Sequence, residues 1–148
     1  MKTTLDTPIG PITIMATDVI TRVAFEPGTD DGDTPLLREA RAQLRAYFSG
    51  KLRRFDLPLG AEGTPFQRAV WGALVTIPYG ERRSYGDLAR TLGKPKATRA
   101  VGGANNKNPI AIVVPCHRVV GSDGSLTGYA GGLPKKEFLL ALEARHAR

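Results

Sequence analysis

The chain has 148 residues, of which 41% are hydrophobic and 24% are charged, and its formal net charge is +7. This composition is typical of a folded globular protein and argues against a disordered chain, and no apolar run approaches the ~20 residues that a membrane-spanning helix needs. The single cysteine, Cys116, excludes an intramolecular disulfide and a cysteine-based zinc cluster. The first residues lack the pattern of a secretion signal, so we expect a cytoplasmic protein.

The basic excess is confined to one part of the chain. Residues 1–60 carry eight basic and eight acidic side chains, so the whole excess belongs to residues 61–148. This asymmetry favours a polyanionic partner such as nucleic acid, and a merely solubilising surface is the alternative.

The first 60 residues predict a small α/β lobe. Residues 10–26 alternate apolar and polar side chains around Thr17-Asp18, which predicts two antiparallel strands. Apolar residues at helical spacing predict a helix over 35–48 that Gly50 can close, and a further strand is expected over 53–59. The fold class is therefore α/β, with an N-terminal lobe over 1–60 that contains an antiparallel sheet and a mostly helical lobe over 61–148.

The second lobe begins with a helix and continues with a helix-turn-helix pattern. Thr64-Pro65 supplies a helix start, and Trp71 on that helix is expected to pack in the core. Ser84 and Asp87 approximate a capping box for a short helix that Gly93 closes, and a second helix begins near residue 97. Two short helices across a tight turn are typical of DNA-binding proteins, although many helical hairpins never touch DNA.

The second helix of this pattern, "RAVGGAN", is unusual for a helix that reads DNA bases. It has one arginine, Arg99, followed by small residues that offer few hydrogen bonds to base edges. The adjacent pair Gly102 and Gly103 costs roughly 1 kcal/mol each in a helix relative to alanine. Such a cost indicates close approach of the backbone to another surface, which is either DNA or a neighbouring helix.

The cysteine lies in a setting that favours a reactive thiol. The apolar run 110–114 predicts a buried strand, and Pro115 fits the first turn of a helix, so Cys116 is expected near a helix N-terminus. The helix dipole and the neighbouring Arg118 would then favour the thiolate. His117 can take the thiol proton directly or through one water molecule.

A third group is needed to orient the imidazole. Glu143, at helical spacing from Leu139 and Leu140, is expected to point inward, whereas Glu137 is the weaker candidate. Two alternatives stay open at this point: Cys116 is an inert buried side chain, or a Cys-His pair performs hydrolysis.

Three stretches, "SYGDLAR", "ATRAVGGANNKNP" and "NPIAIVVPCHRVVGSDGSLTGYAGG", closely resemble the methylated-DNA–protein-cysteine methyltransferases, which repair alkylated guanine directly. The resemblance is dense over residues 64–143. Over residues 1–60 only the layout is similar.

The resemblance implies a role for each matching residue. Cys116 would be the alkyl acceptor, activated by His117 and Glu143 through a hydrogen-bonded water molecule. Asn108 would join the DNA-reading helix to the active-site turn, and Tyr85 would donate a hydrogen bond to guanine and force the nucleotide out of the duplex.

The resemblance also implies how DNA and the flipped base are held. Arg99 would fill the place that the flipped base leaves. Further DNA contacts are expected from Ser84, Ala100, Gly102, Gly103, Arg118 and Ser122. The base pocket would be formed by Val119, Tyr129 and Ala130, together with the backbone at Cys116.

The implied function is direct-reversal repair of double-stranded DNA that is bound through its minor groove. The alkyl group of O6-methylguanine, and also of O4-methylthymine, would move irreversibly to Cys116, once per protein molecule. We expect no cofactor and no metal, because residues 1–60 lack the Cys and His ligands that some relatives use for zinc. A cytoplasmic monomer that associates with the nucleoid when it acts is expected, and a module that only marks damaged DNA is the rival function.

Overall fold

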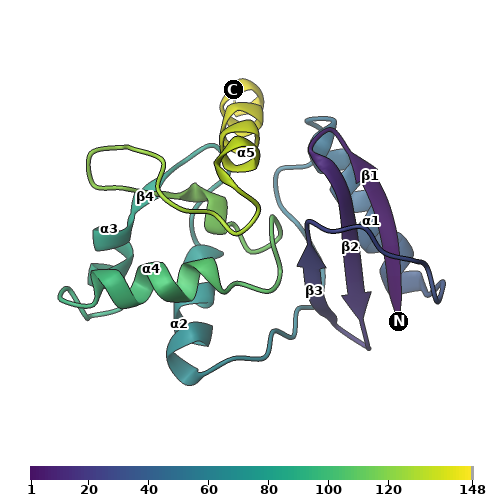
Figure 1. The fold of residues 1–148 in the computed structure, drawn as a ribbon, viewed down its shortest axis with the longest axis horizontal. Coiled ribbons are helices and arrows are strands. Elements are labelled where there is room, and N and C mark those ends of the chain that lie inside the picture. Colours follow the sequence, from purple (N-terminus) through teal and green to yellow (C-terminus); the bar gives the residue numbers. More distant parts are fainter. Residues whose placement is uncertain (148) are drawn as a thin grey trace. The chain divides into compact units, whose positions relative to one another are not determined.

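The computed structural model describes residues 1–147, which divide into two compact units (Figure 1). Unit 1 comprises Met1–Glu62 and Pro109–Val113. Unit 2 comprises Gly63–Asn108 and the chain from Val114 onward. The segment 109–113, which the sequence analysis assigned to the second lobe, is thus part of the first unit.

Unit 1 is built on a three-stranded antiparallel sheet of order β1-β2-β3, with β1 over Lys2–Thr7, β2 over Gly10–Ala16 and β3 over Ile20–Ala24. Strands β2 and β3 confirm the two predicted strands, whereas β1 was not predicted. Ile12 and Ile14 of β2 are buried, in line with the period-two alternation of a strand that has one face on a core.

Helix α1 (Pro35–Phe48) packs on β1 and β2, as Figure 1 shows. Thr34 caps its start by accepting a hydrogen bond from the backbone N–H of Leu37, and Leu37, Leu44 and Tyr47 are buried against the sheet. The helix ends before Gly50, whose φ of +78° lies in the left-handed region that glycine adopts without strain. The predicted helix and its closing glycine are therefore confirmed.

Two short connections cover the free edge of β3. The backbone N–H of Ile20 donates to the carbonyl of Pro58, and the N–H of Val23 donates to the carbonyl of Pro109. Each connection forms one isolated bridge, so the predicted strands over 53–59 and 110–114 are wrong. Proline has no N–H to donate to a longer ladder, which limits both pairings.

Within the described part of the chain, unit 2 contains four α-helices: α2 over Pro65–Leu74, α3 over Tyr85–Thr91, α4 over Thr98–Asn106 and α5 over Leu133–His146. A short parallel pair, β4 (Arg83–Ser84) with β5 (Val119–Val120), and the 3₁₀ helix η1 (Cys116–Arg118) complete it. The α/β fold class is confirmed. Among residues 1–147, every helix falls short of the length or apolar character that a membrane crossing requires.

The helix boundaries in unit 2 follow from local capping. Thr64 and Gln67 form a full capping box on α2, and Ser84 and Asp87 form another on α3. Gly93 closes α3 with a φ of +70°. Helices α3 and α4 pack together across the turn 92–97, so the predicted helix-turn-helix is present.

Candidate active site

Cys116 is the first residue of η1 and is almost fully buried, with 4% of its surface exposed. Cys116 thus begins a helix, as predicted, but η1 is a 3₁₀ helix of only three residues, and the preceding Val113 and Val114 lie in a turn and a bend instead of the predicted strand. Ile112 has a φ of +70°, a conformation that costs a β-branched residue of the order of 1–3 kcal/mol and that reverses the chain just before the cysteine. Cys116 is therefore held on a tight, buried turn.

The surroundings of the thiol keep it protonated at rest. Burial raises the pKa of Cys116, and this effect outweighs the opposing influence of the Asn108 amide, the Lys136 ammonium and the Tyr129 hydroxyl. The expectation that a helix dipole and Arg118 favour the thiolate is therefore wrong, because η1 is too short to carry a large dipole and Arg118 is paired elsewhere. A proton acceptor is needed before the sulfur can attack.

His117 is fully buried beside Glu143, and its Nε2 lies 2.6 Å from Oε2 of that residue. Burial lowers the pKa of His117, the Glu143 carboxylate raises it, and Arg118 and Lys136 lower it again, so that the net pKa is below its ordinary value. Because an ionised carboxylate only accepts hydrogen bonds, the neutral ring carries its proton on Nε2. Its Nδ1 is buried and has no hydrogen-bond partner among the described residues, so its lone pair is available to accept a proton.

Glu143 on α5 is ionised although it is buried. Burial raises its pKa, but hydrogen bonds and charges from His117 and Arg118 outweigh burial and hold the pKa far below its ordinary value. The backbone N–H of Gly80 also donates to Oε1 at 3.2 Å. Glu137, the weaker candidate of the sequence analysis, is exposed.

Arg118 does not lie on the surface, which contradicts the prediction that it contacts DNA. Its Nε and one terminal nitrogen donate to the two carboxylate oxygens of Glu143 at 2.8 and 3.0 Å, and the other terminal nitrogen donates to the carbonyl of Ile77 at 2.7 Å. A pattern of local residues could not reveal this pairing, because the partner lies 25 residues away in the chain.

Two asparagines connect α4 to the active-site turn. Asn108 Nδ2 donates to the carbonyl of Val114 at 2.9 Å, which is the kind of link that the sequence resemblance implied. Asn105 was not predicted, and its Nδ2 lies 3.4 Å from the carbonyl of Cys116 itself. Asn105 lies in the last turn of α4, three residues before Asn108, which follows the end of the helix, and this spacing was the signal available.

Lys136 on α5 is a second residue that the sequence analysis missed. It is fully buried, and its Nζ donates to the carbonyls of Thr127 and Gly128 at 2.8 and 3.3 Å. Burial lowers its pKa, and the nearby Cys116 raises it. Its helical spacing from Leu139, Leu140 and Glu143 placed it on the buried face and was the signal available.

The loop 121–132 brings Tyr129, one of the predicted pocket residues, next to the cysteine. Burial raises the pKa of the Tyr129 hydroxyl well above its ordinary range, and the charge and hydrogen bond of Cys116 raise it further, so the two side chains are neighbours. Val119 is buried, whereas Ala130 is exposed. The hydroxyl of Thr127 donates to the hydroxyl of Tyr85 at 3.1 Å, which ties this loop to the start of α3.

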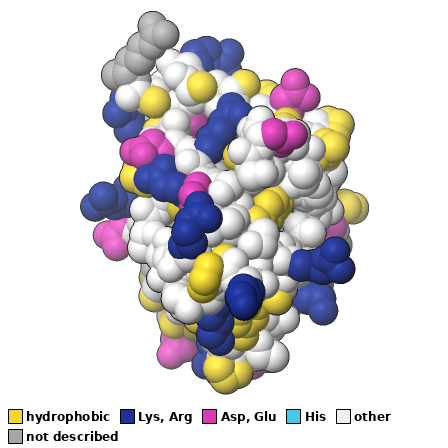
Figure 2. Space-filling view, turned by 90° about the vertical axis from the view of Figure 1, so that its left-hand side faces the viewer, with side chains coloured by type: hydrophobic (Ala, Val, Ile, Leu, Met, Phe, Trp, Pro, Cys, Tyr) yellow, Lys and Arg dark blue, Asp and Glu magenta, His cyan; other side chains and the backbone are white. Residues whose placement is uncertain are grey.

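The remaining predicted DNA contacts lie on exposed or partly exposed parts of unit 2. Arg99 and Ala100 are exposed on the first turn of α4, and Ser122 is exposed in the loop. The Ser84 hydroxyl accepts the Asp87 N–H as a helix cap. Lys and Arg side chains are scattered over the face in Figure 2, which is the side of Figure 1 where α3 and α4 are drawn.

The two glycines of α4 have space around them. A Cβ at Gly103 would meet nothing within 4 Å, and a Cβ at Gly102 would make only ordinary contacts of 3.7 Å with the Tyr85 ring. Packing inside the protein therefore requires glycine at neither position, which weighs against the neighbouring-helix explanation for the pair.

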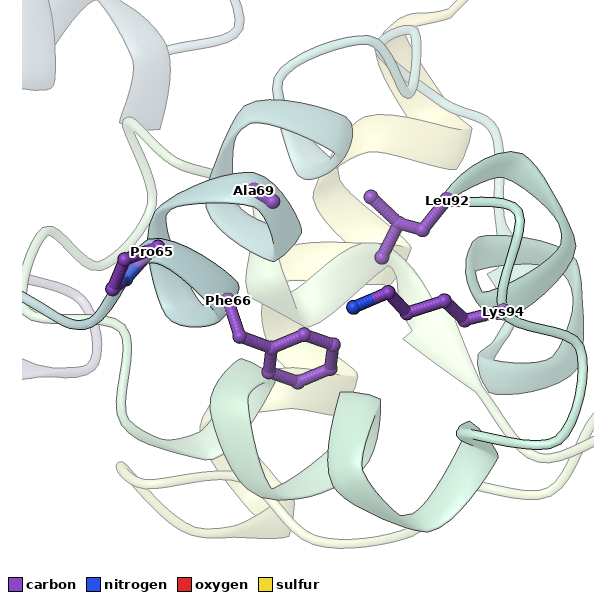
Figure 3. Close-up of a pocket in the computed structure, with 5 residues that line it drawn as sticks. All are labelled: Pro65, Phe66, Ala69, Leu92 and Lys94. Carbon is purple, nitrogen blue, oxygen red and sulfur yellow. The ribbon is translucent and has the colours of Figure 1, made fainter.

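A pocket of about 370 Å³ lies beside the helix-turn-helix, and Cys116 is not among the residues that line it (Figure 3). Pro65, Phe66 and Ala69 of α2 line it together with Leu92 and Lys94, and the Lys94 Nζ lies 5.3 Å from the centre of the Phe66 ring. It contains no nucleophile and no acid-base pair, so the chemistry belongs to the turn at Cys116. Among residues 1–147, no three His, Cys, Asp or Glu side chains are grouped to hold a metal ion.

Comparison with known proteins supplies the family. The model described as 6-O-methylguanine DNA methyltransferase, ribonuclease-like domain, matches residues 1–61, and the model of the DNA binding domain of the same protein matches residues 65–145. The methylated-DNA–protein-cysteine methyltransferase of Methanosarcina barkeri is 53% identical in an alignment of 153 positions, gaps included, that covers 97% of each chain.

Solved structures agree with this match. The crystal structure of Mycobacterium tuberculosis OGT in complex with DNA is 50% identical, covers 97% of this chain and 92% of that chain, and has a TM-score of 0.90. The structure of S. pombe Atl1 with damaged DNA containing O6-carboxymethylguanine is 32% identical, covers 55% of this chain and 78% of that one, and has a TM-score of 0.50. The resemblance drawn from the sequence is confirmed: the chain belongs to the 6-O-methylguanine DNA methyltransferase family, which repairs alkylated DNA by direct transfer of the alkyl group to a cysteine.

Proposed function

We propose that Cys116 accepts, once and irreversibly, the alkyl group carried by O6 of guanine in double-stranded DNA. One observation supports this best: the only thiol of the chain lies next in sequence to a neutral histidine whose Nδ1 is free and whose Nε2 is bound to the Glu143 carboxylate. Such a group is a general base with its proton-accepting atom unoccupied. An inert structural cysteine needs no such neighbour.

The reaction balances without any cofactor. The thiol proton moves to His117 Nδ1, directly or through one water molecule, and the sulfur attacks the methyl carbon. The carbon–O6 bond breaks with its electron pair on guanine, which then takes up one proton. The products are guanine and a thioether at Cys116, and the chain has no second thiol to remove the methyl group. Each molecule therefore acts once.

The raised pKa of Cys116 indicates that proton transfer to His117 accompanies or precedes the attack of the sulfur on the methyl carbon. Because burial keeps the sulfur protonated at rest, the thiolate forms only as the proton is handed to His117. The nearby Lys136 ammonium and the Asn108 amide favour the charged sulfur once it forms. A preorganised positive charge of this kind stabilises the transition state more than the resting state.

The family model for DNA binding spans 65–145, and we propose that α4 enters the minor groove of DNA. A groove about 6 Å wide excludes large side chains, which suits the exposed small residues Ala100 and Gly103. Arg99, exposed on the first turn, would fill the stack after the base has flipped, at a cost of a few kcal/mol for unstacking. Tyr85 would hold the flipped nucleotide.

Val119, Tyr129 and Ala130 would form the base pocket beside Cys116. The same geometry would admit O4-methylthymine, whose methyl group is attached to an equivalent exocyclic oxygen. We further propose that the chain acts as a monomer in the cytoplasm and associates with the nucleoid while it acts, because each event needs one thiol and one DNA lesion.

The decisive experiment weighs the protein after incubation with a duplex that contains one O6-methylguanine. The peptide with Cys116 should gain about 14 Da, the mass that replaces a proton by a methyl group at the nucleophile. The variant Cys116→Ser should show no gain yet keep its affinity for the duplex. Binding without any mass gain in the native protein would indicate a damage marker, and product in molar excess over protein would indicate a hydrolase.

A further inference from the structure

The guanidinium of Arg118 binds the carboxylate of Glu143, which in turn contacts His117, the proposed general base. It forms a fork with Glu143, Nε to Oε1 at 2.8 Å and a terminal nitrogen to Oε2 at 3.0 Å, while Oε2 also lies 2.6 Å from His117 Nε2. A planar fork of this kind fixes both the position and the rotation of a carboxylate. Arg118 thus determines where the oxygen bound to His117 lies.

The arginine is itself held rigidly. Its other terminal nitrogen donates to the Ile77 carbonyl at 2.7 Å, and its guanidinium carbon lies 5.7 Å from the centre of the Tyr79 ring. Only 6% of the residue is exposed. Solvent therefore screens its charge little, and the charge acts on Glu143 and His117 at close range.

We infer that Arg118 is a positioning residue for alkyl transfer: it fixes the Glu143 carboxylate and offsets its negative charge, so that His117 stays neutral with Nδ1 free to receive the thiol proton. The inference rests on the proposed function of Cys116. Without the arginine, an uncompensated carboxylate 2.6 Å from the ring would favour imidazolium, which cannot accept a proton.

The other charges around His117 do not replace this effect. Glu143 and Lys136 act on it from α5, and Arg118 acts on it from η1. Lys136 donates to the Thr127 and Gly128 carbonyls, whereas the two hydrogen bonds of the fork to Glu143 come from Arg118. Loss of Arg118 therefore removes both the fork and the nearest compensating charge.

The test compares the native protein with Arg118→Gln and Arg118→Lys in two measurements. The first is the pH dependence of the single-turnover transfer rate at saturating duplex. The second is the protonation of His117, followed by NMR of the imidazole nitrogens, which is simple because the chain has only two histidines and His146→Gln assigns the other.

In Arg118→Gln, the pKa of His117 should rise by about one unit or more, and the acidic limb of the rate profile should move by the same amount. Transfer at pH 6 should then fall by a larger factor than transfer at pH 8, because protonated His117 cannot accept the thiol proton. Arg118→Lys, which keeps the charge and loses the fork, should show a smaller shift. A rate that falls equally at every pH, with His117 still neutral, would assign Arg118 a purely structural role and overturn the inference.

Two arrangements keep the test decisive. If Arg118→Gln does not fold, the native protein alone serves: His117 should remain neutral with its proton on Nε2 at pH 6, and an imidazolium at that pH overturns the inference. Failure of the proposed function looks different, because it appears as absence of the mass gain on Cys116 in the native protein whatever the state of His117.

Discussion

The indole N–H of Trp71 on α2 donates a hydrogen bond of 2.9 Å to the backbone carbonyl of Ala104 on α4. The tryptophan is buried, and the carbonyl belongs to the last turn of α4, where the helix has few N–H groups left to offer. The predicted core role of Trp71 is thus confirmed, with an addition that the sequence did not reveal. One side chain anchors the helix that is proposed to enter DNA.

Trp71→Phe should destabilise the protein by about 1–2 kcal/mol, because it removes this hydrogen bond and part of a buried ring. The loss stays moderate since the Ala104 carbonyl also accepts the N–H of Lys107. Urea unfolding followed by circular dichroism measures the change, and DNA affinity should fall with it as α4 loosens. Unchanged stability would show that the bond contributes nothing.

Gly103→Ala should separate stability from DNA binding. Alanine in an open helical site stabilises a helix by about 0.5–1 kcal/mol, yet the added methyl group would keep α4 from the floor of a narrow groove. Thermal unfolding should therefore improve while affinity for duplex DNA falls severalfold. Gly72→Ala on α2, at an equally open position, is the matched control and should improve stability alone. Full DNA affinity in Gly103→Ala would contradict the proposed role of α4.

Arg99→Ala should slow transfer from duplex DNA by about tenfold or more and leave transfer from the free O6-methylguanine base unchanged, because only the duplex requires a filled stack. Arg99→Lys keeps the charge without the planar group and should recover only part of the rate. Both rates are read from the methylated fraction of Cys116 over time. Equal losses on both substrates would rule out the stack-filling role.

Stability should fall with acidity in two stages. The folded pKa of His117 lies below its ordinary value of 6.5, so the unfolded chain binds more protons and the free energy of unfolding falls as the pH drops below 6.5. The depressed pKa of Glu143 adds a second loss as the pH drops below its ordinary 4.5. Thermal unfolding between pH 8 and about 2 measures both, and His117→Gln should remove the first. A native protein that gains stability from pH 7 to 5 would refute this assignment.

Local patterns predicted local structure well. The strands β2 and β3, helix α1, the helix start at Thr64-Pro65 and the capping box of Ser84 and Asp87 depend on residues a few positions apart, and each was confirmed. Strand β1 escaped notice because its apolar content is low, with Leu5 the only strongly apolar residue in "KTTLDT". Its partner strand, not its own composition, decides its conformation.

The sequence failed where distant residues decide the outcome. The run 110–114 is buried as expected, but the left-handed backbone of Ile112, together with Pro109 just before the run, prevents a strand. The resemblance assigned Arg118 to DNA, whereas the structure pairs it in the interior with the carboxylate of Glu143 on α5, 25 residues away in the chain. The sign of the pKa shift at Cys116 was wrong for the same reason, since burial is a property of the whole fold.

The burial and protonation of Cys116 also affect how many protein molecules remain able to repair DNA. A cysteine that accepts one alkyl group cannot be regenerated. Every protein molecule whose thiol reacts with peroxide or with a free alkylating agent therefore leaves one lesion unrepaired. Thiols react with such agents mainly when they are ionised and accessible to solvent. Before DNA binds, the Cys116 thiol is protonated and buried. Burial in this fold therefore protects the Cys116 thiol from side reactions until a damaged base is bound.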